Sequence, residues 1–246
     1  MAKRTVLIGL LFTCSGAPAA ELLWGFGPQD GMPYVAVRHQ QLVGGFTRLL
    51  GERVADRLAV RVRFIETPNN RLEGFLQEGR IQLICNANPS WVTQADHLHW
   101  SQPLYQEEDS LLQHAESADY SELVSLHGKT LGTSLGFVYS APLMAAFSNG
   151  SVQRQDVRDL ETRVHMLSRR RLDALIDMRR PLAYYLARNP ELPVRFSSWV
   201  VSRYWMHCVY SPHLGVAAEQ MDKVLLELRE HGEIDAMLNQ AARETY

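Results

Sequence analysis

Residues 72–86, LEGFLQEGRIQLICN, align without a gap with residues 163–177, RVHMLSRRRLDALID, which follow 91 positions later. Each copy has the spacing of a short amphipathic helix, then a polar or basic turn, then an apolar strand. The first strand ends on Asn86 and the second on Asp177. In open α/β sheets, ligands bind outside the carboxyl ends of the strands. The repeat therefore predicts two similar lobes that face each other across a cleft.

Helix and strand patterns alternate through the rest of the chain, which favours an α/β fold with a mainly parallel sheet in each lobe. Strand patterns cover 22–26, 60–65, 110–113, 130–133 and 205–210, and helical spacing covers 45–55, 181–187, 221–228 and 234–242. The chain is expected to cross between the lobes near 106–110 and near 202–204, and such a double crossing permits hinge closure. We predict lobe one over 20–106 and 204–246, and lobe two over 107–203.

The N-terminus has the pattern of a secretory signal. Two basic residues precede an apolar stretch at 6–12, and the small residues Ala-Pro-Ala follow at 17–19. We therefore predict a signal peptide over 1–19 and a mature protein in the periplasm. Cys14 could instead accept a lipid, but Thr13 before it is larger than the residue that such cleavage usually needs.

The charge balance gives no sign of a nucleic-acid or membrane-surface partner. Without the two basic residues of the signal, 23 basic side chains remain against 27 acidic ones, a net charge of −4 with histidine neutral. No later segment is an uncharged run of the roughly 20 residues that a membrane-spanning helix needs. We expect a soluble exported monomer without a cofactor and without a nucleic-acid partner.

Several short segments occur together in an order that a known family shares. They are MPY at 32–34, VGGF at 43–46, QEGRIQL at 77–83, WSQPLY at 100–105, LHGKTLG at 126–132, RLDAL at 171–175 and EHGEI at 230–234. With them the chain resembles the type II periplasmic solute-binding proteins, in the family of the amino-acid ABC transporter receptors (bacterial extracellular solute-binding protein family 3). The resemblance covers nearly the whole mature chain and implies a two-lobed receptor that serves a membrane permease.

Two recognition residues of that family are replaced in this chain. The family's arginine after the third strand holds the α-carboxylate, and counting back from Trp100 places Gln94 at its position. Glutamine lacks the guanidinium fork that binds a carboxylate at two points. The family's aspartate for the α-ammonium group falls on Met178, one residue after Asp177. The resemblance therefore implies a solute receptor but not one for a standard α-amino acid.

The resemblance implies a cleft lined by aromatic and amide groups. The candidate ligand-binding residues are Phe26, Tyr34, Asn69, Asn86, Asn88, Trp91, Gln94, Ser134, Gly136, Phe137, Tyr139 and Asp177. This lining suits a small polar solute that is partly aromatic or cationic. Asp177 could hold a cationic group, with Trp91 or Tyr139 adding a cation–π contact. Asp177 could instead pair with Arg179 or Arg180. Trp91 could instead be a core residue.

Two cysteines, Cys85 and Cys208, remain after the signal is removed. An exported protein can bond them, whereas two buried free thiols are equally compatible with their apolar, strand-like surroundings. In the family that the chain resembles, the strand that returns to lobe one lies beside the third strand. The resemblance therefore implies that these cysteines lie on adjacent strands and form a disulfide.

Signals for catalysis or metal binding are weak. Asp96, His97 and His99 are close in sequence but have no further ligand at a recognisable spacing. Some relatives of this fold, the cyclohexadienyl dehydratases, act on a prephenate-like substrate, and Asp177 or Glu66 would then be the acid. We expect a receptor that is not an enzyme. A sensor subunit that signals to a membrane protein is a further alternative, because either partner could detect lobe closure.

Overall fold

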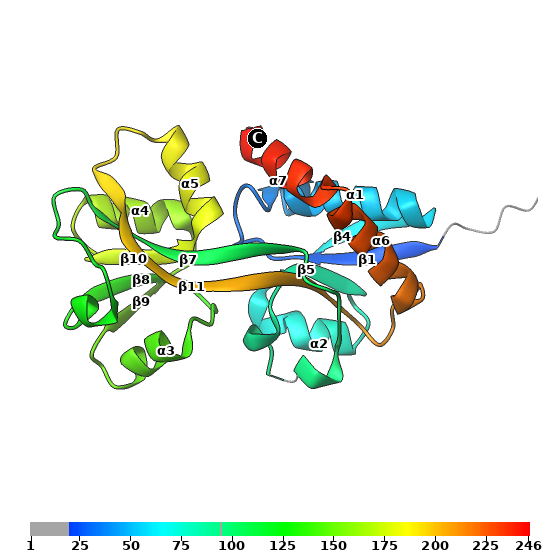
Figure 1. Cartoon of the computed structure of the whole chain (residues 1–246), viewed down its shortest axis with the longest axis horizontal. Coiled ribbons are helices and arrows are strands. Elements are labelled where there is room, and N and C mark those ends of the chain that lie inside the picture. Colours follow the sequence, from blue (N-terminus) through cyan, green and yellow to red (C-terminus); the bar gives the residue numbers. More distant parts are fainter. Residues whose placement is uncertain (1–19, 94) are drawn as a thin grey trace, which may run out of the picture.

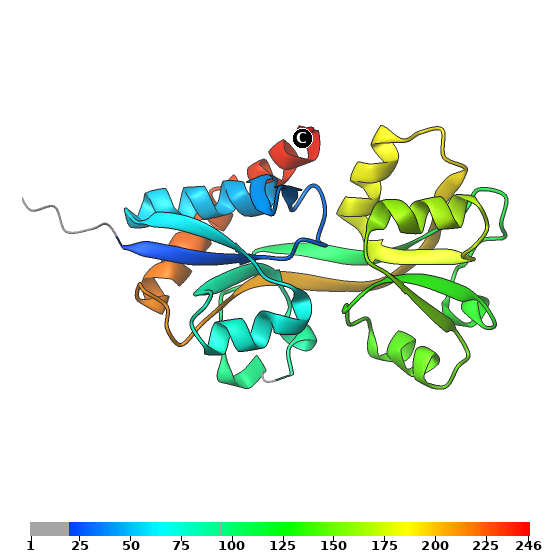
Figure 2. The same cartoon turned by 180° about the vertical axis from the view of Figure 1, so that it is seen from behind.

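The computed structural model describes residues 20–93 and 95–246, so the predicted signal peptide over 1–19 and Gln94 lie outside the described residues. Two lobes lie side by side and are joined by two long strands (Figures 1 and 2). These strands are β7 (Tyr105–His114) and β11 (Val194–Tyr210). No helix in the described ranges has both the length and the apolar character needed to cross a membrane.

The first lobe is built from both ends of the chain. Its elements are β1 (Glu21–Phe26), β2 (Ala36–Arg38), β3 (Gln41–Gly44), α1 (Phe46–Leu58), β4 (Arg61–Glu66), α2 (Leu72–Gln77), β5 (Leu83–Ala87), β6 (His99–Trp100), α6 (Ala218–Glu230) and α7 (Glu233–Arg243). Three single-turn 3₁₀ helices, η1 (Asn69–Arg71), η2 (Pro89–Trp91) and η3 (Ala95–His97), lie in its loops. Helices α1, α6 and α7 cover one face of its sheet and α2 the other (Figure 1).

The second lobe is formed by the middle of the chain. Its elements are η4 (Leu123–Leu126), β8 (Thr130–Ser134), α3 (Ala141–Ser148), β9 (Gln153–Val157), α4 (Leu160–Ser168), β10 (Ala174–Met178) and α5 (Arg179–Arg188). The sheet path through both lobes is β4-β1-β5-β11-β7-β10-β8-β9, and β6 also pairs with β11. The pairs β1/β4, β1/β5, β8/β10 and β8/β9 are parallel, which confirms the mainly parallel two-lobed fold.

The hinge is a ribbon of two continuous strands. β7 and β11 pair antiparallel from His114 opposite Val194 to Tyr105 opposite Met206. Both predicted crossings, 106–110 and 202–204, fall inside these strands and not in loops. The lobe boundaries at these crossings stay a prediction. A hydrogen-bonded ribbon can bend or twist without losing its pairing, so the connection suits rigid-body motion of two lobes.

The repeat in the sequence is a repeat in the structure. α2 leads into β5 and α4 leads into β10, and both strands are buried along their whole length. Gly79 and Arg170, which are equivalent by the 91-residue offset, both have a positive φ, 68° and 56°. In both copies, the amide of the next residue donates to a carbonyl oxygen five residues earlier at 2.9 Å. The two units therefore share a turn as well as a sequence pattern.

The core of lobe one forms where the apolar faces of α1, α6 and α7 meet the sheet. In α1 the residues Phe46, Leu50, Val54 and Leu58 recur every fourth position and are all buried, which is the period of a helix with one apolar face. They pack with Trp24 of β1 in one cluster. Each such side chain contributes on the order of 1.5–3 kcal/mol when it leaves water. This packing fixes β1 and β5, whose carboxyl ends reach the cleft.

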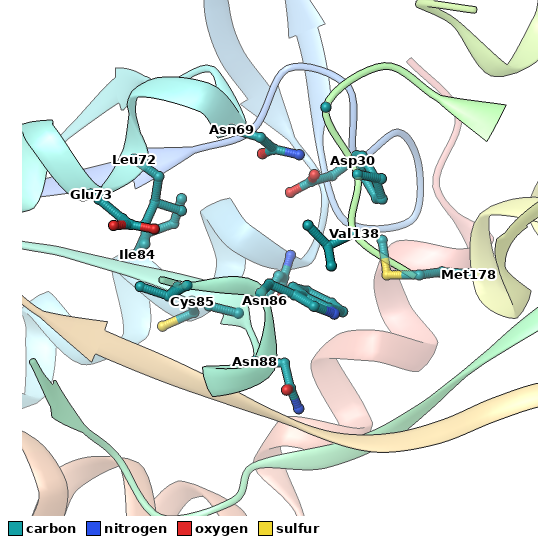
Figure 3. A pocket seen from close by; sticks show the side chains of 15 residues that line it. Asp30, Asn69, Leu72, Glu73, Ile84, Cys85, Asn86, Asn88, Val138 and Met178 are labelled. Carbon is teal, nitrogen blue, oxygen red and sulfur yellow. The ribbon is translucent and has the colours of Figure 1, made fainter. Parts of the chain in front are cut away.

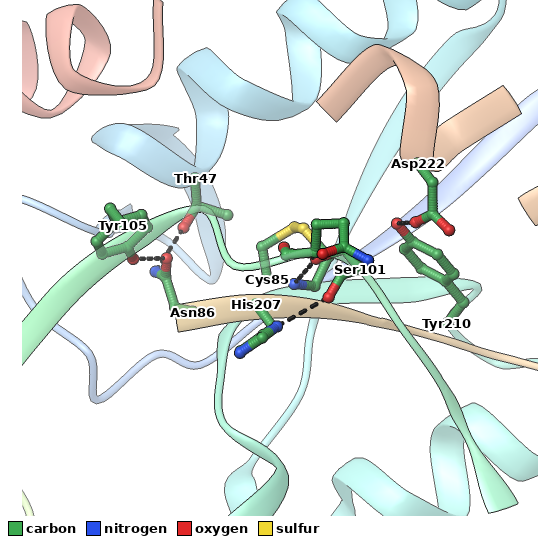
Figure 4. Close-up of a disulfide and its surroundings, with 10 residues drawn as sticks. Thr47, Cys85, Asn86, Ser101, Tyr105, His207, Tyr210 and Asp222 are labelled. Atoms are coloured by element: carbon green, nitrogen blue, oxygen red, sulfur yellow. Dashed lines mark hydrogen bonds between the residues drawn. A yellow bond between two sulfur atoms is a disulfide. The ribbon is translucent and has the colours of Figure 1, made fainter. Parts of the chain in front are cut away.

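A disulfide joins Cys85 of β5 to Cys208 of β11, with their Cα atoms 3.9 Å apart (Figure 4). β5 and β11 are antiparallel neighbours, with His207 opposite Ala87 and Val209 opposite Ile84. This confirms the predicted bond and the predicted adjacency of the two strands. The disulfide ties the returning strand to lobe one next to the position of Asn86.

Candidate functional site

A pocket lies between the lobes and is lined by residues of both (Figure 3). Lobe one contributes Asp30, Asn69, Leu72, Glu73, Ile84, Cys85, Asn86, Ala87, Asn88, Trp91 and Val92, and lobe two contributes Gly136, Phe137, Val138 and Met178. The space not filled by protein atoms is about 680 Å³, part of the open mouth included. Pockets for small molecules have this mixture of apolar walls with a few polar groups.

Six of the predicted ligand-binding residues meet in this pocket: Asn69, Asn86, Asn88, Trp91, Gly136 and Phe137. The first four lie at or just beyond the ends of lobe-one strands: Asn86 is in β5, Asn69 in η1 and Trp91 in η2, and Asn88 caps η2. Gly136 and Phe137 belong to the loop that follows β8 of lobe two. The rule that ligand sites form at the carboxyl ends of strands therefore places these residues together.

The amide of Asn86 is held from both sides (Figure 4). The hydroxyl of Tyr105 donates to Asn86 Oδ1 at 2.5 Å, and Asn86 Nδ2 donates to Thr47 Oγ1 at 3.3 Å. Asn86 also has a positive φ of 57°, which asparagine tolerates better than most residues. These contacts orient the side chain before any ligand arrives.

Trp91 and Asn88 form a wall against the hinge. The Trp91 ring packs edge-on against the ring of Tyr204 in β11, with ring centroids 5.2 Å apart. Asn88 Nδ2 donates to the carbonyl oxygen of Trp205 at 2.8 Å, while Asn88 Oδ1 accepts from the amide of Ser90 at 2.9 Å. The predicted aromatic side of the pocket is therefore held against β11, one of the two strands that join the lobes.

Four further candidates lie in the cores and not on the pocket: Phe26, Tyr34, Ser134 and Tyr139. Tyr34 donates its hydroxyl hydrogen to Glu107 Oε2, and burial raises the pKa of Tyr34. The Tyr139 hydroxyl oxygen accepts from the amide of Ser134 at 2.9 Å. These residues support the walls of the cleft, and direct contact with a ligand stays a prediction for them.

The segment Gly132-Thr133-Ser134-Leu135-Gly136 has the residue spacing of a serine-hydrolase elbow. Ser134 Oγ is buried and has no hydrogen-bond partner among the described residues. A serine nucleophile needs a base within hydrogen-bonding reach. The segment therefore lacks the geometry of a nucleophile, although it has the spacing.

Asp177 does not line the pocket and is paired. Arg163 Nη2 donates to Asp177 Oδ2 at 2.5 Å, and the amide of Met178 donates to Asp177 Oδ1 at 2.7 Å. The partner is thus neither Arg179 nor Arg180. Met178 is the residue of this strand end that lines the pocket. The position at which the resembled family has an aspartate therefore presents a thioether here.

Several lining residues were not anticipated from the sequence: Asp30, Leu72, Glu73, Ile84, Cys85, Ala87, Val92, Val138 and Met178. Asp30 is the one with a clear chemical consequence. Desolvation raises the pKa of Asp30 to about 7, and the negative charge of Asp177 acts in the same direction. The sequence did carry one signal for Asp30: it lies in the turn-rich loop after the first strand, and that loop follows the carboxyl end of a strand, where ligand sites form.

The hinge beside the pocket carries a second group of acidic residues. Asp109 of β7 accepts hydrogen bonds from Ser202 Oγ at 2.7 Å and from the Tyr204 hydroxyl at 2.8 Å, both in β11. Burial raises the pKa of Asp109 to about 6, against the effect of these two bonds. Glu107 pairs with Arg180 at 2.9 Å. In the described part of the chain, no three His, Cys, Asp or Glu side chains are grouped so that they could hold a metal ion.

Comparisons with known proteins give the fold a context. No protein-family model matches the chain. It is 26% identical over 148 residues to a probable histidine-binding protein of Campylobacter jejuni, a match that spans 60% of this chain and 57% of that protein. The chain thus matches little more than half the length of this relative.

Solved structures match over almost the whole chain. An ancestral arginine-binding protein bound to arginine superposes with a TM-score of 0.76 at 17% identity, covering 90% of this chain and 97% of that one. The amino-acid ABC transporter substrate-binding protein AbpA of Streptococcus pneumoniae, bound to L-arginine, gives 0.74 at 17% identity, covering 91% and 95%. These matches confirm the predicted resemblance: the chain has the two-lobed fold of the type II periplasmic solute-binding proteins, and its solved structural neighbours include amino-acid ABC transporter receptors.

Proposed function

We propose that this protein is a non-catalytic periplasmic receptor that closes its two lobes over a small solute and delivers it to an ABC transporter in the membrane. The observation that carries the proposal is the pocket, because both lobes supply its lining. A ligand that contacts both lobes stabilises the closed form through contacts that the open form lacks. The relatives named as histidine- and arginine-binding proteins support the same class of function.

The solute that we propose is small, polar or partly aromatic, and not a standard α-amino acid. Met178 lines the pocket at the position where the resembled family has its ammonium-binding aspartate. Asp177 next to it is already paired with Arg163. Gln94 stands where that family has its carboxylate-binding arginine. Neither end of a free α-amino acid therefore has its usual partner.

Native mass spectrometry of protein purified from its host is the direct test. A receptor of this kind is expected to retain a small molecule, which dissociates on unfolding and can be identified by its mass. Adding that molecule back to stripped protein should raise the melting temperature, because a ligand that binds only the folded state stabilises it. Absence of any retained solute, together with no thermal shift across a solute library, would contradict the proposal.

The same purified protein can also distinguish the receptor from the two alternative functions, an enzyme and a sensor subunit. Turnover of prephenate by the purified protein would make it an enzyme, and the receptor proposal predicts none. Co-purification of the ligand-loaded protein with a permease supports transport, whereas co-purification with a membrane kinase or cyclase supports signalling.

A further inference from the structure

We propose that the pocket takes an organic cation that lacks a free carboxylate group, and that Asp30 binds its positively charged nitrogen. The inference rests on the proposed receptor function and adds the chemical class of the ligand. It also assigns to Asp30 the role that the sequence suggested for Asp177.

The charges on the pocket wall favour a cation. Its lining carries two carboxylates, Asp30 and Glu73, and no arginine, lysine or histidine among the described residues. Glu73 Oε1 already accepts a hydrogen bond from the amide of Thr93 at 2.7 Å. Asp30 has neither a side-chain hydrogen bond nor an ion pair to any residue in 20–93 or 95–246. A carboxylate left without a partner in a ligand pocket is the group that a cation would satisfy.

The position of Asp30 is set by the loop after β1. The amide of Asp30 donates to the carbonyl oxygen of Gly27 at 3.2 Å, which closes a turn. The carboxylate lies over Gly27, since a Cβ added there would come 2.7 Å from Asp30 Oδ1. The side chains of Asp30 and Asn69 point toward the same space (Figure 3). An ammonium or guanidinium group there could donate to Asp30 and to the amide oxygen of Asn69.

The remainder of the lining suits the body of such a cation. Trp91 of lobe one and Phe137 of lobe two both line the pocket. Aromatic faces within about 6 Å attract a cation through the ring quadrupole. Leu72, Val138 and Met178 add apolar surface for a hydrocarbon chain. The pocket therefore combines one free anion with aromatic and aliphatic walls.

Arg158 is the basic residue that would instead favour a ligand with a carboxylate group. Arg158 lines an adjoining outer hollow together with Asn69 and Gly136, which also line the pocket. Arg158 is exposed, and a carboxylate on an extended ligand could reach it. A decisive test must therefore compare each amine with the amino acid that differs from it only by the carboxylate.

Isothermal titration of the mature protein with agmatine, arginine, histamine and histidine provides that comparison. We expect at least one amine to bind at least about tenfold more tightly than its amino acid. Asp30→Asn should lower the affinity for that amine at least about tenfold, since a charge-assisted hydrogen bond is lost. Asp235→Asn removes a carboxylate at an exposed site in α7 and is the matched control, with affinity expected within about twofold.

Three outcomes would overturn the inference: binding of neither amine, tighter binding of arginine or histidine than of the matching amine, or unchanged affinity in Asp30→Asn. If Arg158→Gln then weakens the amino acid, the outer hollow holds a carboxylate. In each case the receptor function survives if protein from the host retains another solute. The failure of the cation assignment is thus distinguishable from the failure of the receptor proposal.

Discussion

Arg163 of α4 and Asp177 of β10 form a buried ion pair, with Nη2 and Oδ2 2.5 Å apart and side-chain exposures of 1% and 5%. Arg163 Nη1 also donates to the carbonyl oxygen of Ile176 at 3.0 Å. The pair therefore fixes the carboxyl end of β10, where Met178 reaches the pocket. The carboxylate that the sequence suggested as a ligand partner is thus bonded to a helix within the second copy of the repeat.

Removing one partner of this pair should destabilise the protein strongly. Arg163→Met leaves Asp177 charged and buried, and breaking a buried pair in this way costs about 3–5 kcal/mol. Urea unfolding of the ligand-free protein measures the loss. The exposed pair Arg170–Glu116 provides the control, because Arg170→Met should cost less than about 1 kcal/mol. Equal losses in the two variants would show that the buried pair does not anchor β10.

The disulfide should account for a sizeable part of the stability. The replacement of both Cys85 and Cys208 by alanine is expected to lower the free energy of unfolding by about 2–5 kcal/mol, because the bond closes a loop with a sequence separation of 123. Alkylation of the mature, unreduced protein followed by mass spectrometry should find no free thiol. Two labelled cysteines would reject the bond.

The ligand-free protein should lose stability as the pH rises toward 7. Asp30 has a folded pKa raised to about 7 from 3.8, so the folded state binds more protons than the unfolded state between these values. The stability that Asp30 contributes is therefore complete below about pH 4 and is lost as the pH passes through 7. Burial of Asp30 is the main cause of its raised pKa, and the negative charge of Asp177 acts in the same direction.

Asp30→Asn tests this titration. The variant should be more stable than the wild type at pH 8 by on the order of 1–4 kcal/mol, and equal to it near pH 4. The variant should still lose some stability between pH 4 and pH 6, because burial raises the pKa of Asp109 to about 6. Asp235→Asn should leave the profile unchanged. A wild-type profile that is flat from pH 4 to 8 would contradict the assignment.

Phe137→Ala should weaken binding of the retained solute roughly tenfold without unfolding the protein. Phe137 lines the pocket and packs against the cores of both lobes, so we expect its ring to contact the ligand and to favour closure. Isothermal titration measures the affinity and circular dichroism checks the fold. Val124→Ala, at a 63% exposed site of lobe two, should bind as the wild type does. Unchanged affinity in Phe137→Ala would show that this loop is not part of the binding site.

Asn86 should behave differently from Phe137. Its side-chain amide is hydrogen-bonded to Tyr105 and Thr47, so Asn86→Ala removes two internal hydrogen bonds as well as the ligand contact that we propose for this side chain. We expect a loss of about 1–3 kcal/mol in unfolding free energy together with weaker binding. A variant that binds weakly at full stability would show that those bonds contribute little.

The sequence predicted most helices and strands but missed β6, β9, the β2–β3 hairpin, residues 105–109 of β7 and residues 194–204 of β11. The strand pattern predicted only 205–210, whereas β11 begins at Val194, directly after Pro193. Register shifts lie on either side of Val200 in its pairing with β7, and they break the alternation by which a strand is recognised. Strand length in the hinge is decided by pairing across lobes, which a local pattern does not report.

The sequence by itself determined the duplicated helix, turn and strand, because these depend on apolar spacing and on the left-handed turn at Gly79 and Arg170. The rule for strand ends also placed Asn86 at the cleft, and the resemblance to the solute-binding family placed Phe137 there. Only the tertiary structure decided that Met178 reaches the pocket while Asp177 turns to Arg163, since successive strand residues face opposite sides. Only the tertiary structure placed Asp30 there, because a loop has no period from which its direction could be read.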